Sequence, residues 1–283
     1  MFLDQILESI RMATARPRLQ KRLKRLLGAH PVSIAIYLLV MWGLIELALK
    51  GSAAMGYNWQ WYRVPKYFFT EGADGITIGA IPWGLVGTLT LSGLAFALAF
   101  LIGLVIALLR LSDLMVGPAV ARVFLEVIRN MPLLVLLYVF YYVFGPIFGL
   151  DRYSASVLCL AFFHGALMSE IFRGGINAVA RGQWEAAESI GMTKGQIYRY
   201  IILPQSVKFM LPPMTSEVVN MIKSSAIVSV IAVVELTTVG RNIISDTYMS
   251  FEIWFTIAAV YMAVTLIIST FASYLERRYA VRD

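Results

Sequence analysis

The sequence predicts an all-α integral membrane protein with about six transmembrane helices and both termini in the cytoplasm. Of its 283 residues, 59% are hydrophobic and only 14% are charged, whereas soluble domains are about 25% charged. The apolar runs lack the alternation of apolar and polar residues that outer-membrane barrels show. Since helices and closed barrels are the structures that satisfy backbone polar groups in lipid, a helical bundle remains.

Long uncharged runs predict the spanning helices, because crossing the hydrocarbon core takes about 20 mostly apolar residues. Five runs approach this length: Leu26–Ile45, Gly75–Leu109, Asn130–Leu150, Tyr153–Ser169 and Ile253–Leu275. A sixth candidate, Met210–Leu236, is weaker because it carries Glu217, Lys223 and Glu235.

The positions of the basic residues orient these helices. With six crossings, eighteen of the 24 Lys and Arg residues fall on one side of the membrane and five on the other, with Lys223 inside a helix. Cytoplasmic loops collect Lys and Arg, so both termini are expected in the cytoplasm. The net charge of +7 therefore reflects topology and the anionic leaflet, and no nucleic-acid partner is expected.

The chain is expected to have three parts. Residues 1–29 form a basic cytoplasmic arm, in which residues 2–12 are either an interfacial amphipathic helix or a frayed end. Residues 30–81 form one transmembrane helix and an external connector, and residues 82–283 form the core domain. The connector carries aromatic residues typical of the membrane interface, namely Trp59, Trp61, Tyr62, Tyr67 and Phe68.

The segment 173–210, called the coupling loop below, joins the fourth and fifth predicted helices. Trp184, Ala187 and Ile190 recur at helical spacing, which predicts a short amphipathic helix with Gly191 as its stop. Ala186 and Ala187 would let that helix approach a partner closely, and Pro204 would restrict the turn back toward the membrane. From periodicity alone, a solvated linker with a surface helix is the favoured alternative.

Motif spacing makes this loop distinctive. Glu185-Ala186-Ala187, then three residues, Gly191, nine residues and Ile201-x-Leu203-Pro204 resembles the EAA loop of bacterial ATP-binding-cassette importer permeases. The segments 87–92, 126–134 and 169–175 resemble the polar amino-acid branch of that family. The resemblance covers about residues 82–278. The first predicted helix resembles an additional transmembrane helix that some family members have. Two segments, Asn130-Met131 and Leu167-Met168, depart from the family pattern. The resemblance therefore does not identify the substrate.

The resemblance implies a MetI-like bundle with a cytoplasmic coupling helix at 181–190. It implies that a groove of an ATPase subunit receives this helix. The ATPase-coupling residues would be Trp184, Glu185, Ala186, Ala187, Ile190, Gly191 and Pro204.

The implied function is that of the permease subunit of an ATP-driven importer for polar amino acids, either glutamate-, aspartate- or glutamine-like or basic. It would work by alternating access in the bacterial inner membrane. Its partners would be a second permease subunit, identical or homologous, two ATPases and an external binding protein. The chain has no phosphate-binding loop of the Gly-x-x-x-x-Gly-Lys-Ser/Thr type, so ATP and Mg²⁺ are expected on the ATPases. No catalytic residue, cofactor or metal site of its own is expected, since it has one cysteine and two histidines.

Lys223 is the first candidate for a substrate contact, with Asn220, Ser216 and Ser224 nearby. A lysine at mid-membrane costs about 2.5–3.5 kcal/mol, so it should face the bundle interior or a wet cavity. There it would bind the α-carboxylate of an amino acid, and the resemblance likewise implies substrate contacts on this helix. The alternatives are pairing with a carboxylate or reaching toward one interface.

Two pairs of charges lie three residues apart at the cytoplasmic boundary. Glu126 with Arg129, and Glu170 with Arg173, predict intrahelical ion pairs. The alternative is a gate whose charges exchange partners between inward-open and outward-open states. His164, in an apolar helix, predicts an interhelical hydrogen bond rather than a proton relay. The small-residue pairs Gly93/Ala97 and Gly103/Ala107 would permit close contact between helices.

Two other functions fit the sequence less well. An ion-coupled secondary transporter would use Glu126, Glu170 or Lys223 in proton exchange, but it predicts inverted repeats that the sequence does not show convincingly. An intramembrane enzyme needs a nucleophile with a base or a set of metal ligands. Ser229, His164 and Cys159 suggest no such arrangement.

Overall fold

The computed structural model describes residues 30–72, 75–112 and 115–279. The chain divides into two compact units, residues 1–59 and 60–283. The described element of the first unit is the apolar helix α3 (His30–Ala54), in which Lys50 and Glu46 form an ion pair at 3.5 Å. The predicted basic arm 1–29, with its amphipathic segment 2–12, lies outside the described residues.

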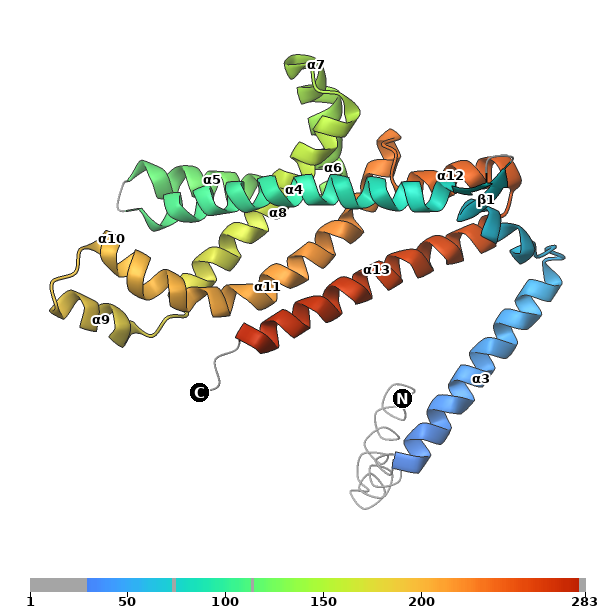
Figure 1. The fold of residues 1–283 in the computed structure, drawn as a ribbon, viewed down its shortest axis with the longest axis horizontal. Coiled ribbons are helices and arrows are strands. Elements are labelled where there is room, and N and C mark those ends of the chain that lie inside the picture. The colour runs from blue at the N-terminus through green and yellow to red at the C-terminus, as the bar shows by residue number, and fades with distance from the viewer. Residues whose placement is uncertain (1–29, 73–74, 113–114, 280–283) are drawn as a thin grey trace, which may run out of the picture. The chain divides into compact units, whose positions relative to one another are not determined.

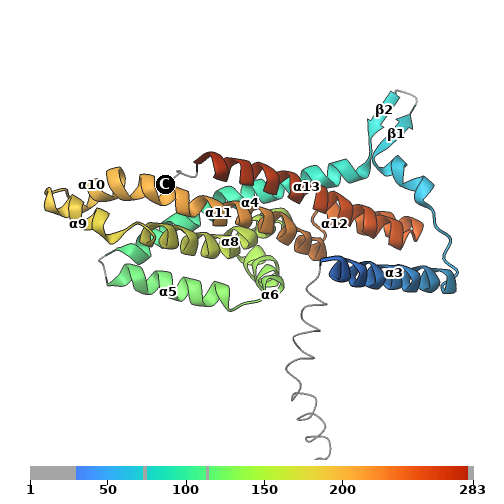
Figure 2. The same ribbon diagram turned by 90° about the horizontal axis from the view of Figure 1, so that it is seen from below.

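The second unit is a helical bundle with one small hairpin (Figure 1). The coupling loop lies at one end of its long helices, and the hairpin lies at the other end (Figures 1 and 2). The elements, in chain order, are the 3₁₀ helix η1 (Trp61–Tyr67), the strands β1 (Phe69–Gly72) and β2 (Gly75–Ile78), and the helices α4 (Ala80–Leu111), α5 (Val116–Arg129), α6 (Leu133–Tyr138), the π-helical η2 (Val139–Phe144), α7 (Gly145–Phe148), α8 (Arg152–Asn177), α9 (Arg181–Ser189), α10 (Lys194–Gln196), the π-helical η3 (Ile197–Ile202), α11 (Leu203–Ser224), the 3₁₀ helix η4 (Ser225–Ile231), α12 (Leu236–Thr247) and α13 (Ser250–Tyr279).

Four described helices are long and apolar enough to cross a membrane, namely Ser33–Ala54, Ala80–Leu111, Arg152–Asn177 and Ser250–Tyr274. Two bent pairs also qualify together. The helices at 116–129 and 133–148 meet at 105°, and those at 194–231 and 236–247 meet at 46°. Counting each bent pair as one span gives six, so the predicted multi-pass helical class is confirmed.

The predicted helical run from Gly75 is wrong at its start. Residues 75–78 form β2, which pairs antiparallel with β1 so that Phe69 lies opposite Ile78. Gly75 has φ 106°, a conformation that a side chain disfavours, and the β-branched residues that follow it suit an extended strand. The helix therefore begins only at Ala80.

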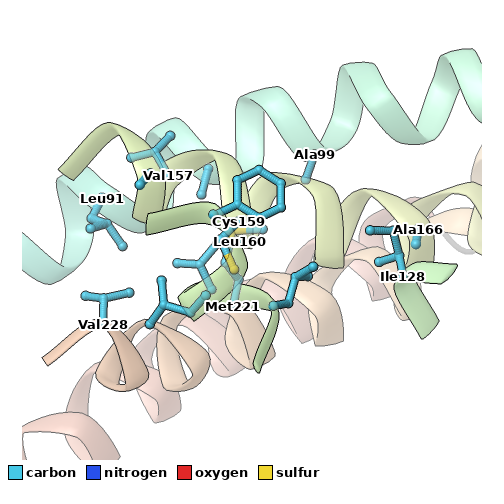
Figure 3. Close-up of a cluster of buried hydrophobic side chains, with 14 of the residues drawn as sticks. Leu91, Ala99, Ile128, Val157, Cys159, Leu160, Ala166, Met221 and Val228 are labelled. Carbon is cyan, nitrogen blue, oxygen red and sulfur yellow. The ribbon is translucent and has the colours of Figure 1, made fainter. Parts of the chain in front are cut away.

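Small residues bring α4 and α8 into close contact. A Cβ atom added to Gly103 would lie 2.6 Å from the Cβ of Met168 and 3.0 Å from the carbonyl oxygen of Gly165. The close approach predicted for Gly103 is thus confirmed, whereas Gly93 has open space around it in the described chain. The buried cluster between α4, α8 and α11 includes Cys159, which is fully buried (Figure 3).

The predicted run Met210–Leu236 is not one helix. The helical segment formed by α11 and η4 is terminated at Ala232, whose φ of 57° is left-handed, and α12 begins after Glu235. The buried Glu235 carboxylate accepts hydrogen bonds from the backbone N–H groups of Thr237 at 2.8 Å and Thr238 at 2.7 Å. Glu235 is therefore an N-cap, and a helix N-terminus offers both free N–H donors and a favourable dipole to a carboxylate.

A second carboxylate cap gives a prediction about pH. Asp151, which precedes α8, accepts hydrogen bonds from the backbone of Ser154 at 3.0 Å and Tyr153 at 3.3 Å. These bonds, chiefly those from Ser154, lower the pKa of Asp151 from 3.8. A lowered folded-state pKa stabilises the helix start above pH 3.8, and this contribution is lost as the pH falls through the lowered value.

We therefore expect faster hydrogen exchange at residues 153–155 in Asp151→Ala than in the unaltered protein at neutral pH. Asp151→Asn should keep the cap, since asparagine is an equally good N-cap, but without the acid dependence. Equal exchange in the alanine variant and the unaltered protein would contradict the capping role.

Candidate functional site

The predicted helix of the coupling loop is α9, and it ends as the sequence predicts. Gly191 has φ 78°, its N–H donates to the carbonyl of Glu188 at 2.9 Å, and the N–H of Met192 donates to the carbonyl of Ala187 at 3.2 Å. These two bonds form a Schellman motif, which favours glycine at the left-handed position. The motif fixes where α9 stops and how the chain turns toward α10.

The two faces of α9 differ from what the sequence suggested. Ala187 is only 4% exposed, because it packs into a cluster that includes Ile197 and Ile202. The ring of Trp184 stands edge-on to Tyr198 at 5.2 Å. Ala187 lies one turn of helix from Trp184, and both side chains face their own chain; contact of Ala187 with an ATPase stays a prediction.

Other side chains of α9 are exposed in this chain. Glu185 and Ala186 are exposed, and so is the large apolar side chain of Ile190, 77% of which is accessible. Glu185 accepts a hydrogen bond from Arg181 at 3.0 Å in an exposed ion pair.

Pro204 does not mark a turn, contrary to the sequence prediction. It is the second residue of α11, which continues directly from the π-helical η3. Because proline has no N–H group and its ring crowds the carbonyl four residues earlier, the wider π-helical turn of η3 just before Pro204 accommodates it within a continuous helix.

Glu170 collects three arginines from three helices. Its carboxylate is paired with Arg110 of α4, with Arg129 of α5 at 3.3 Å and with Arg173 of α8 at 2.9 Å. The Glu170 side chain is one-quarter exposed. The predicted Glu170–Arg173 pair is thus present, and it belongs to a larger network that joins α4, α5 and α8.

The predicted pair of Glu126 with Arg129 is wrong. Among the described residues, Glu126 has no ion-pair partner, and its carboxylate accepts a hydrogen bond from the side-chain amide of Asn130 at 3.0 Å. Arg129 is the last residue of α5, and its side chain reaches across to Glu170.

Three of the four substrate-contact candidates line one cavity of about 480 Å³ between α11 and α13. Ser216, Asn220 and Lys223 lie on one face of α11 because they are spaced by one turn each. Ser224 is not among the lining residues. The described lining consists of Pro212, Pro213, Thr215, Ser216, Val219, Asn220 and Lys223 of α11 and Ser269, Ala272 and Ser273 of α13.

Among the described residues that line this cavity, Lys223 is the charged one. It forms no ion pair with any carboxylate in the described part of the chain, so the alternative of local pairing finds no support there. Asn220 donates to the Oε2 atom of Glu217 at 3.4 Å. The cavity therefore offers one cation, an amide and several hydroxyl groups.

His164 forms the interhelical hydrogen bond that the sequence predicts, and its partner is Glu217 of α11 at 2.6 Å. Glu217 was not among the candidate residues predicted from the sequence, although an acidic residue in an apolar segment is itself a signal. Arg110, which lies in the last turn of a long apolar helix, was not predicted either. Residues 30–72, 75–112 and 115–279 contain no group of three or more His, Cys, Asp and Glu side chains that could hold a metal ion.

Comparison with known proteins identifies the family. Residues 118–281 match the model of the family described as "Binding-protein-dependent transport system inner membrane component". The chain belongs to this family. This permease is 34% identical over 208 residues to the glutamine transport system permease protein GlnP of Escherichia coli (strain K12), covering 71% of this chain and 95% of GlnP.

Two further similarities extend this result. The permease is 29% identical over 240 residues to the glutamate/aspartate import permease protein GltJ of the same strain, covering 79% of this chain and 96% of GltJ. It is also similar to a crystal structure of an amino acid ABC transporter with histidines. That chain is 43% identical with a TM-score of 0.67, over 70% of this chain and 94% of its own.

These similarities decide between the transporter classes. They confirm the ABC importer permease fold and the ABC importer interpretation, and they do not fit an ion-coupled secondary transporter. The permease is a multi-pass membrane subunit.

Proposed function

We propose that this permease forms the membrane pathway of an ATP-driven importer for polar amino acids of the glutamate, aspartate or glutamine type. The observation that carries the substrate class is the cavity lined by Lys223, Asn220 and Ser216. A solute with a carboxylate and a second polar group suits one cation beside an amide and hydroxyls. The names of the relatives GlnP and GltJ, for glutamine transport and glutamate/aspartate import, agree with this class.

The complete importer contains more subunits than this chain. We place a second permease copy or homologue beside it, two ATPases against the coupling loop, and an external binding protein that delivers solute. ATP and Mg²⁺ bind to the ATPases. The exposed side of α9, formed by Glu185, Ala186 and Ile190, is the docking surface, and the assembly lies in the bacterial inner membrane.

Transport follows from coupled equilibria. ATPases in two nucleotide states hold α9 differently, and this difference in binding free energy biases the membrane helices toward outward-open or inward-open arrangements. Trp184 and Ala187 transmit the displacement, because they anchor α9 to its own chain. Glu170 with its arginines is the gate at the same end of the bundle, where α4, α5 and α8 separate or close.

Within the cavity, Lys223 binds the α-carboxylate of the solute. Asn220 and Ser216 hydrogen-bond its other polar groups. Ser224 lies beside Lys223 in the chain but outside the cavity lining, so it is the weakest of the four candidates.

Replacing Lys223 with methionine should leave the complex assembled but reduce uptake at subsaturating solute at least tenfold. Loss of one charge-assisted hydrogen bond accounts for this, since such a bond contributes about 1.5–3 kcal/mol. Uptake is measured in proteoliposomes as a function of solute concentration, and the KM should rise. Lys50→Met is the matched control, because Lys50 is an exposed lysine of α3 that lies outside both the cavity lining and the coupling loop. Normal uptake by the Lys223 variant would remove this residue from the site.

The proposed function is tested by reconstituting the permease with a candidate ATPase and binding protein. ATP inside the vesicles should drive accumulation of glutamine or glutamate without any ion gradient. Uptake driven by a proton gradient in the absence of the ATPase would refute the proposal.

A further inference from the structure

The buried pair of His164 and Glu217 joins the two helices that flank the coupling loop. The Nδ1 atom of His164 on α8 and the Oε1 atom of Glu217 on α11 are hydrogen-bonded at 2.6 Å. The two side chains are 1% and 8% exposed. Because α8 leads into the loop and α11 leads out of it, this bond ties together the two helices on which the loop is mounted.

Stability alone does not account for such a pair. A buried ionisable pair between apolar helices is often no more stabilising than well-packed apolar side chains. In addition, the Nε2 atom of His164 has no hydrogen-bond partner among the described residues. A directional bond does, however, fix how far one helix is shifted along another, whereas apolar surfaces tolerate sliding.

The same two helices approach closely near the loop, so their relative position matters there. A Cβ atom on Gly175 of α8 would lie 3.3 Å from the carbonyl oxygen of Ser206 on α11, and it would overlap the flexible side chain of Met210. A shift between α8 and α11 would therefore change the contacts directly beneath the coupling loop.

The pair also reaches the cavity. The second carboxylate oxygen of Glu217, Oε2, accepts a hydrogen bond from the side-chain amide of Asn220 at 3.4 Å. Asn220 lines the cavity together with Lys223. A continuous set of contacts thus leads from α8 through Glu217 to the cavity wall.

We propose that His164 and Glu217 are positioning residues for transport. They hold α8 and α11 in one register as the coupling loop moves, and they orient Asn220 toward the solute. This inference rests on the proposed function, because it assigns the pair a part in coupling ATP hydrolysis to solute movement.

The first test compares substitutions in the reconstituted importer. The double variant H164L/E217L should keep the thermal unfolding temperature close to that of the unaltered complex, but solute moved per ATP hydrolysed should fall at least fivefold. The KM for solute should also rise. Glu217→Gln keeps an oxygen acceptor for His164 and should retain most of the coupling. A purely structural role predicts that transport follows the unfolding temperature, so a stable double variant with unchanged coupling would overturn the proposal.

The second test measures register without transport. In a Cys159→Ala background, Gly175→Cys with Met210→Cys should cross-link efficiently in membranes. Gly175→Cys with Met214→Cys, one turn further along α11, should not cross-link when Met210→Ala leaves room for the new side chain at position 175. Adding H164L/E217L should make both pairs cross-link. If the cross-linking pattern stays the same, the pair does not set the register.

These outcomes separate the two proposals. Absence of ATP-driven uptake by the unaltered complex would refute the proposed function. Unchanged coupling or unchanged cross-linking in the double leucine variant would refute the positioning role alone.

Discussion

Replacing Gly191 with valine is expected to reduce ATP-driven uptake at least tenfold while the permease still inserts into the membrane. Gly191 has φ 78°, and a Cβ atom built there meets nothing within 4 Å. The effect is therefore conformational: the left-handed backbone costs an ordinary residue about 1–2 kcal/mol, and a β-branched one more. Without the Schellman bonds, the end of α9 and the exposed Ile190 lose their fixed positions.

Two variants act as controls for this prediction. Gly191→Asn should recover much of the uptake, because asparagine tolerates the left-handed region. Gly182→Ala, within α9, also meets nothing within 4 Å and has ordinary backbone angles, so it should not reduce uptake. Uptake and co-purification of the ATPase are measured together. Full activity of Gly191→Val would show that the ending of α9 has no part in coupling.

Removing the carboxylate of Glu170 should have the second large effect. Glu170→Leu leaves Arg110, Arg129 and Arg173 facing one another without their shared acceptor. Lost charge-assisted bonds are worth about 1–3 kcal/mol after allowance for partial exposure, so the unfolding temperature should fall and uptake should drop at least tenfold. Thermal unfolding and uptake of the purified complex test this.

Glu126→Leu is the matched control for Glu170→Leu. Glu126 is also an acidic residue near the same helix ends, but its carboxylate accepts only the Asn130 amide among the described residues. We expect near-normal stability and uptake. Equal effects of the two substitutions would contradict the special position of Glu170 among the arginines.

The helix of the coupling loop and its end could be predicted because their signals are local. Both the helix period and the stop at Gly191 lie within residues 181–191. The direction in which α9 faces could not be predicted, since it depends on Ile197 and Ile202 across the loop. The burial of Ala187 within its own chain was consequently not predicted.

The charge networks show the same limit. Spacing of three residues predicted Glu170 with Arg173 correctly but also suggested Glu126 with Arg129. The actual partner of Arg129 is 41 residues away, and that of Arg110 is 60 residues away. Such pairs depend on the packing of α4, α5 and α8, which no local pattern contains.

The hydropathy of the sequence predicted the positions of the membrane-spanning helices better than the residues at which they begin and end. The run Met210–Leu236 is apolar enough to suggest one helix, yet Ala232 adopts a left-handed backbone and Glu235 caps a new helix. The extended start at Gly75 was concealed for the same reason. Backbone reversals and caps alter a helix without altering its average apolarity.

Labelling of Ile190→Cys tests the central claim most directly, that a cytoplasmic ATPase moves this permease through α9. Position 190 is highly exposed, and the native Cys159 is fully buried, so background labelling should be low. A membrane-impermeant maleimide should label this cysteine in inside-out vesicles but not in right-side-out vesicles, and bound ATPase should block the labelling. Labelling from the outer side, or no protection by an ATPase that supports uptake, would contradict the account.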